Sequence, residues 1–152
     1  MSRDTRIFAL CLAALALIIL GSATLTTFAT AHGAPQFMRW PFKVMCHGIP
    51  HRCLTIFGTQ MPICARCVGI YAGFLGGLAL FPLFRWASER AMRIALFVAT
   101  TPLFIDGVTQ ALRFRESTNQ LRLATGLTTG VMLGLWALVA IETRARQRFA
   151  PS

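Results

Sequence analysis

Four long apolar stretches decide what kind of fold this chain can adopt. They cover residues 7–28, 63–84, 94–112 and 121–141. Each has roughly 20 residues, the length that an α-helix needs to cross the hydrocarbon core of a bilayer. Apolar residues make up 55% of the chain and charged residues only 13%, which is typical of a multi-span membrane protein. The sequence therefore predicts one all-α integral membrane domain over residues 1–152, a four-span helical bundle.

The first stretch has two interpretations. Arg3 and Arg6 precede it, and Ala29-Thr30-Ala31 near its end has the small-residue form of a signal-peptide cleavage site. We favour an uncleaved membrane span, because the apolar character continues well beyond the short hydrophobic region of a signal peptide. A cleaved signal peptide is the alternative.

Residues 32–62 separate the first two spans and are rich in proline. The four prolines are Pro35, Pro41, Pro50 and Pro62. Proline interrupts helices, so we expect a loop on the membrane surface, with a re-entrant piece around Ile56 and Phe57. We expect Pro62 to occupy the first turn of the second span, where a missing N–H is tolerated.

Four of the five cysteines lie in this loop and at the start of the second span. Cys64 and Cys67 form a CxxC motif, and a helix N-terminus favours the thiolate form. Cys46 and His47 precede this motif by sixteen residues, close to the spacing of zinc-ribbon knuckles. Thiolates with an imidazole select zinc, with iron as the second choice. The sequence therefore predicts a Cys3His-type metal site formed by Cys46, His47, Cys64 and Cys67. Adjacent residues rarely bind one metal, so His51 or Cys53 is an alternative to either member of the first pair.

Polar residues also occur inside the third and fourth spans. Asp106 and Gln110 are four residues apart and share one helix face, as do Asn119 and Arg122. An ionised side chain within a membrane is costly unless it is paired or hydrated. We predict either a buried Asp106–Arg122 ion pair or a polar cavity beneath the cysteines. In the second case these four residues are the catalytic candidates, with Asp106 as the base.

Arginines account for nearly all of the positive charge. The net charge of +10 rests on fourteen arginines and one lysine, most of them at predicted helix ends. This placement favours anchoring to lipid headgroups and argues against binding of nucleic acid. Arg52 and Arg66 lie within the cysteine motif, where guanidinium groups are candidate contacts for an anionic ligand such as phosphate. Headgroup anchoring is the simpler interpretation of these two residues.

Two series of glycines recur every four residues in the predicted spans. They are Gly69, Gly73 and Gly77 in the second span, and Gly126, Gly130 and Gly134 in the fourth. Such small-residue ridges allow helices to approach closely. We expect them to mediate helix–helix contact, including contact with a partner helix.

Four spans place both termini on the same side of the membrane. Eight arginines would lie on that side, at positions 3, 6, 85, 90, 93, 144, 146 and 148. Seven basic residues would lie on the other side, at positions 39, 43, 52, 66, 113, 115 and 122. If Arg52, Arg66 and Arg122 belong to a site and are not counted, eight basic residues lie on the side of the termini and four on the other side. This excess favours cytoplasmic termini and an extracytoplasmic cysteine cluster, in the inner or plasma membrane of the cell.

Residues 46–134 resemble a prokaryotic family of small predicted membrane proteins known as domain of unknown function 2085. The resemblance rests on four motifs, which read CHGIPHR at 46–52, PICARCVGIYAG at 62–73, DGVTQ at 106–110 and STNQLRLATG at 117–126. It implies that one site contains Cys46, His47, Arg52, Cys64, Arg66, Cys67, Asp106, Gln110, Asn119 and Arg122. Cys53 stands where the family more usually has serine, which argues against it as a ligand. The family has no established activity.

These features support three functional hypotheses. The first is a metal-binding membrane protein that acts on a lipid-linked or membrane-embedded substrate, with the metal polarising an oxygen atom or activating water. The second is a thiol redox protein in which Cys64 and Cys67 form a reversible disulfide without metal. The third is a non-enzymatic transport or assembly subunit with a structural metal, docked through the glycine ridges. The sequence leaves open whether the protein is an enzyme.

Overall fold

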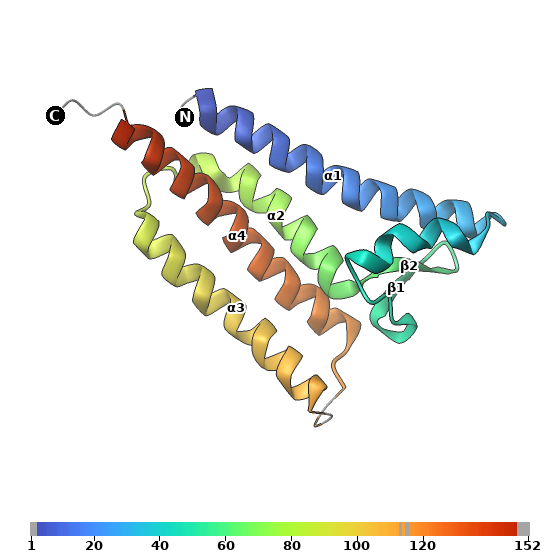
Figure 1. The fold of residues 1–152 in the computed structure, drawn as a ribbon. Helices are drawn as coiled ribbons and strands as arrows, with labels where there is room; N and C mark the ends of the chain where they lie inside the picture. Colours follow the sequence, from blue (N-terminus) through green and yellow to red (C-terminus); the bar gives the residue numbers. More distant parts are fainter. Residues whose placement is uncertain (1–2, 113, 115, 149–152) are drawn as a thin grey trace.

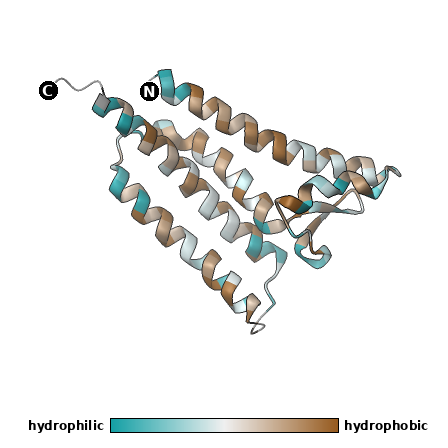
Figure 2. Ribbon diagram, viewed as in Figure 1, coloured by the Kyte–Doolittle hydropathy of each residue, from teal (hydrophilic) through white to brown (hydrophobic). Residues whose placement is uncertain are grey.

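The computed structural model describes residues 3–112, 114 and 116–148. Its four long helices are α1 (Arg3–Ala31), α2 (Ala65–Phe84), α3 (Glu89–Ala111) and α4 (Asn119–Arg148), shown in Figure 1. All four are long and apolar enough to cross a membrane. Hydrophobic residues run along the helices, and hydrophilic residues gather at the first turns of α1, α3 and α4 and at the end of α4 (Figure 2). The predicted four-span helical bundle is confirmed.

The helices lie side by side in the order α1, α2, α4, α3 (Figure 1). The start of α1 and the end of α4 lie at one end of the bundle, and the loop between α1 and α2 lies at the other. Of its most apolar 18 residues, α4 buries 50%, whereas α3 buries 6% and α1 buries 11%. The pair formed by α2 and α4 is therefore the centre of the bundle, and the outer helices leave most of their apolar side chains uncovered.

The two glycine ridges pack directly against each other. A Cβ atom added to Gly73 would lie 2.2 Å from the Leu127 carbonyl oxygen, and one added to Gly130 would lie 2.2 Å from the Ile70 carbonyl oxygen. Real Cβ atoms do not approach other atoms so closely. The close helix contact expected from the glycine spacing thus occurs between α2 and α4 within the chain. Docking of a partner helix on these ridges stays a prediction.

The ends of the helices differ from the predicted ones for local reasons. α2 begins at Ala65 rather than residue 63, because Pro62 lies in strand β2 (Thr59–Cys64) and not in a helical turn. α3 begins at Glu89 rather than residue 94, because the hydroxyl of Ser88 caps it by accepting a hydrogen bond from the N–H of Ala91 at 3.2 Å.

The loop between α1 and α2 contains a β-hairpin. Strand β1 (Cys53–Ile56) pairs antiparallel with β2, and Ile56 faces Thr59 across a two-residue turn. Phe57 and Gly58 in this turn have φ angles of 56° and 72°, the left-handed values that a tight hairpin turn requires. At the position of the expected re-entrant piece the backbone forms this strand pair, and insertion of the turn into the bilayer stays a prediction. Two 3-10 helices precede the hairpin, η1 (Gln36–Val44) and η2 (Pro50–Arg52).

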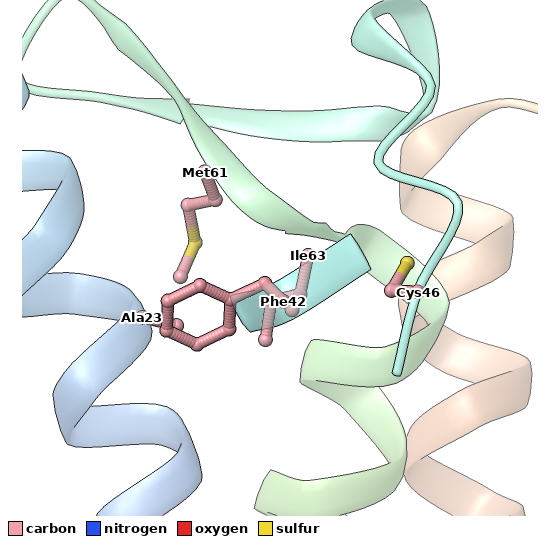
Figure 3. Packing of buried hydrophobic residues seen from close by; sticks show 5 residues of the cluster. All are labelled: Ala23, Phe42, Cys46, Met61 and Ile63. Atoms are coloured by element: carbon pink, nitrogen blue, oxygen red, sulfur yellow. The ribbon is translucent and has the colours of Figure 1, made fainter. Parts of the chain in front are cut away.

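A small apolar cluster fixes the loop on α1. It contains Ala23 of α1, Phe42 of η1, Cys46, and Met61 and Ile63 of β2, all buried. Figure 3 shows the Phe42 ring between Ala23 and Ile63, with Cys46 on the side of the cluster nearest α2. Burial of these side chains removes apolar surface from water and orders the loop. The cluster thereby holds Cys46 beside the start of α2.

Candidate functional site

Three cysteines converge at the start of α2. The Sγ atoms of Cys46, Cys64 and Cys67 all lie within 4.8 Å of one another. The sulfurs of Cys64 and Cys67 are 3.5 Å apart, and the backbone N–H of Cys64 donates a hydrogen bond to the Cys46 sulfur at 3.2 Å. Zinc–sulfur bonds of about 2.3 Å in a tetrahedral site separate the sulfurs by about 3.8 Å. One ion can therefore contact all three thiolates after small side-chain movements.

A glycine allows the segment carrying Cys46 to approach β2. Gly48 has a φ of +56°, and a Cβ added there would lie 3.3 Å from the carbonyl oxygen of Pro62. Any other residue would be strained in this conformation and crowded against the strand. Sequence reasoning gave Gly48 no role, although a glycine directly after a Cys-His pair is the signal that could have indicated one.

The environments of Cys64 and Cys53 differ sharply. The hydrogen bond with the Cys67 side chain, together with the N–H groups of Cys67 and Arg66, lowers the pKa of Cys64 to about 5. Burial raises the pKa of Cys53 to about 11, and its thiol donates to the carbonyl oxygen of Ile49 at 3.3 Å. The environment of Cys64 thus favours the thiolate form, whereas that of Cys53, which lies outside the three-sulfur group, favours the neutral thiol. This difference agrees with the expectation, drawn from the family resemblance, that Cys53 is not a metal ligand.

A cavity of about 350 Å³ opens beside the three sulfurs. Its walls come from the loop, from the first turn of α2, and from α3 and α4. The lining residues are Met45, Cys46, His47, Gly48, Ile49, Arg52, Cys64, Arg66, Cys67, Gln110 and Arg122. The structure thus brings the predicted metal ligands and four of the six predicted polar site residues to one cavity. The other two, Asp106 and Asn119, are not among the described residues that line it.

Asp106 is the only buried residue of α3, a helix that the structure describes completely. Its carboxylate pairs with the guanidinium of Arg66 from α2. Gln110 donates to the same carboxylate at 2.8 Å and accepts from Arg122 at 2.9 Å. The predicted ion pair between Asp106 and Arg122 is therefore wrong. Arg66 pairs with the Asp106 carboxylate, and Gln110 bridges Asp106 and Arg122 through hydrogen bonds.

The polar chain continues from α4 into the hairpin. Arg122 donates to the side-chain oxygen of Asn119 at 3.0 Å, and Asn119 donates to the backbone carbonyl of Cys53 at 3.2 Å. Hydrogen bonds thus connect α2, α3, α4 and β1 at the end of the bundle that holds the thiols. In this chain Asp106 holds Arg66 and Asn119 holds Arg122, two of the three arginines that line the cavity.

Three guanidinium groups retain an unused donor. The Nε atoms of Arg52, Arg66 and Arg122 are buried and have no hydrogen-bond partner. Arg122 is only 4% exposed, whereas His47 is exposed. His47 lines the cavity but is not part of the three-sulfur group. Arg113, three residues beyond Gln110 in the sequence, lies outside the described residues.

Comparison with known proteins identifies the family. A family model described as "Predicted membrane protein (DUF2085)" matches residues 46–136, more than half of the chain. The chain belongs to the DUF2085 family. The matched segment contains all three thiols, the cavity arginines and the Asp106 network, and it leaves α1 outside. Family membership and the four apolar helices together make this chain a membrane protein.

Relatives of this DUF2085 protein occur in archaea. It is 36% identical over 99 residues to an uncharacterized protein of Methanocaldococcus jannaschii, a match that covers 64% of each chain. It is 39% identical over 98 residues to an uncharacterized protein of Methanothermobacter thermautotrophicus, covering 62% of this chain and 85% of the relative. The match thus spans less than two thirds of the first relative's length. No solved structure matches the chain significantly.

Proposed function

We propose that this membrane protein binds one transition-metal ion, preferably zinc, through the thiolates of Cys46, Cys64 and Cys67. The observation that carries the proposal is the mutual approach of the three sulfurs to within 4.8 Å. The lowered pKa of Cys64 supports it, since thiolates rather than thiols bind metals. A set of three soft ligands selects zinc, with iron as the alternative.

The fourth coordination position distinguishes two kinds of metal site. Structural zinc sites are closed by four protein ligands, whereas catalytic sites have three and leave one position for water or substrate. The three sulfurs lie on the wall of the cavity, so we infer that the fourth position opens into it. A metal in such a position polarises a bound oxygen as a Lewis acid. The protein's own residues hold the thiolates at the helix start and surround that position with guanidinium groups.

Metal analysis of the detergent-purified protein tests the proposal. We expect about one zinc or iron per chain in the wild type, and loss of this metal in the Cys64→Ser/Cys67→Ser variant, because hydroxyl groups replace two of three thiolates. Cys11→Ser is the matched control, since Cys11 is an exposed thiol of α1 outside the three-sulfur group. It is expected to retain the metal, as measured by inductively coupled plasma mass spectrometry.

His47→Ala extends the same experiment to the fourth ligand predicted from the sequence. The open-site proposal requires the metal to be retained, because the exposed His47 does not belong to the three-sulfur group. Loss of metal in this variant would instead establish a closed Cys3His site. Retention of metal in the Cys64→Ser/Cys67→Ser variant would remove the basis of the metal proposal altogether.

A second function is favoured by the distance of 3.5 Å between the sulfurs of Cys64 and Cys67. These thiols can exchange with a partner's disulfide, forming their own disulfide while the partner is reduced to two thiols. This function predicts no bound metal and two thiols that react with maleimide only after treatment with a reductant. The metal analysis and the maleimide count on one sample therefore separate the two functions.

The arginine count supports one orientation in the membrane. Arg52, Arg66 and Arg122 line the cavity, so we count them as site residues rather than as surface anchors. We propose cytoplasmic termini and an extracytoplasmic site in the inner or plasma membrane, following the excess of arginines on the membrane side that holds the termini. A fluorescent reporter that folds only in the cytoplasm, fused at the C-terminus, should be bright. A dark fusion present at normal abundance would reverse the orientation.

A further inference from the structure

We propose that the cavity beside the thiols binds a phosphoryl group, held by Arg52, Arg66 and Arg122. The inference adds a ligand class to the proposed metal site. It rests on that proposal in one respect, because contact between the ligand and a metal requires that the metal be bound. The arginine contacts themselves need no metal.

The first argument is the unused hydrogen-bond donors. A buried N–H without a partner is costly, and most such groups in folded proteins are paired with protein, water or ligand. Here three guanidinium groups on one cavity have a buried Nε without a partner. Arg122 is held in place by Asn119 and Gln110 and is 4% exposed, so it cannot turn toward bulk solvent to satisfy its donor.

The second argument is the balance of charge. Three guanidinium groups meet at the cavity, and no carboxylate is among the described residues that line it. The nearby carboxylate of Asp106 is engaged by Arg66 and Gln110. Three thiolates around a divalent metal would carry a net charge of about −1, which offsets only part of the charge of the three guanidinium groups. An anionic ligand restores the balance in either state.

The geometry of the donors favours phosphate over a carboxylate. The three arginines come from three separate elements, η2, α2 and α4, and all three line the cavity, so together they offer more donors than two carboxylate oxygens can accept. A phosphoryl group offers several oxygens in tetrahedral directions, whereas a carboxylate offers two in one plane. A cavity of about 350 Å³ accommodates a phosphoryl group with part of the molecule that carries it.

The location admits two sources of this group. The loop that forms one wall also carries Phe37 and Trp40, which are 70% and 71% exposed, as expected for residues at a membrane–water interface. A phospholipid headgroup can reach the cavity from the bilayer surface, and a soluble phosphate ester can reach it from water. Both present the same phosphoryl oxygens to the arginines.

Isothermal titration calorimetry on the full-length protein in detergent tests the inference. The probes are inorganic phosphate and dihexanoyl phosphatidic acid, with dihexanoyl phosphatidylcholine, whose phosphate is esterified on both sides, as the comparison lipid. We expect Arg52→Gln to weaken binding of phosphate by at least about tenfold, because one charge-assisted hydrogen-bonding group is lost. The matched control is Arg85→Gln, which removes the same charge from the exposed far end of α2 and should leave the affinity unchanged.

Two further variants make the result decisive. Arg52 belongs to a short surface element, so Arg52→Gln should fold even if substitution of the buried Arg122 does not. Arg122→Lys keeps the positive charge but removes the planar guanidinium group with its several donors. Weaker phosphate binding in this variant supports specific hydrogen bonds from the guanidinium to the ligand. Tighter binding of phosphatidic acid than of phosphate identifies a lipid headgroup, and equal binding identifies a soluble ligand.

The inference is overturned if neither probe binds the wild type, or if Arg52→Gln and Arg85→Gln bind phosphate equally well. Metal content is measured on the same samples. Phosphate binding that depends on Arg52 in a protein without metal would refute the metal proposal and support the anion site. A protein with bound zinc and no phosphate binding would support the metal proposal and refute the anion site.

Discussion

Replacing Gly73 by alanine is expected to destabilise the protein far more than the same substitution at Gly76. The added methyl group of Gly73→Ala would lie 2.2 Å from the backbone oxygen of Leu127, so α2 and α4 must move apart. Overpacking typically costs 1–3 kcal/mol, and contact with a rigid backbone places this substitution at about 3 kcal/mol or more. At Gly76 the nearest atom is a flexible methyl of Val131 at 3.8 Å, an ordinary contact.

Thermal unfolding in detergent, followed by circular dichroism, measures the difference. Gly76→Ala should unfold at or above the wild-type temperature, since alanine favours helix over glycine by up to about 1 kcal/mol. Gly73→Ala should unfold at a markedly lower temperature or fail to accumulate. Equal stability of the two variants would show that the ridges do not form the contact between α2 and α4.

Asp106→Asn is expected to produce the second large loss of stability. The substitution keeps the shape of the side chain but removes the charge that pairs with Arg66. Breaking a buried ion pair from one side typically costs 3–5 kcal/mol, because the remaining charge is left without a partner. Arg66 is 24% exposed, which places the expected loss near the lower end of that range, about 3 kcal/mol. Arg66 also lies between Cys64 and Cys67, so we expect weaker metal binding as well.

A double variant separates this pair from a general effect of charge. Asp106→Asn/Arg66→Gln should be less destabilised than the sum of its single variants, because neither partner is then left unpaired. Glu116→Gln is the control, since Glu116 is an exposed carboxylate outside the network. Additive losses of stability, or an equal loss in Glu116→Gln, would show that the ion pair between Asp106 and Arg66 does not stabilise the packing of α3. Unfolding and metal content are both measured.

The spans and the thiol group could be predicted because their signals are local. Roughly 20 consecutive apolar residues identify a span, and the CxxC motif places two sulfurs near the start of one. The partner of Asp106 could not be predicted in the same way. Helix periodicity shows that Asp106 and Gln110 share a face, but not which neighbouring helix that face meets. The glycine contact brings Arg66 beside α4, where it reaches the carboxylate first.

The hairpin was missed because its sequence is unusual for one. Its turn is Phe57-Gly58, and a bulky residue with φ of 56° is rare compared with the usual asparagine or aspartate. Pro62 lies within the second strand, and proline normally argues against a strand. Packing of Phe57 against Phe28 of α1, with ring centroids 5.5 Å apart, helps to hold a turn that local preference does not favour.

The parallel contact between α2 and α4 also bears on how the protein is made. The two helices meet along their length, yet α3 lies between them in the chain. During synthesis α2 therefore enters the bilayer before its main partner α4, with its glycine ridge uncovered. Arg66 acquires its counterion only when α3 follows, and the cavity gains its last wall only when α4 arrives. Assembly of the site is consequently a late step of biogenesis, completed after the last helix has been inserted.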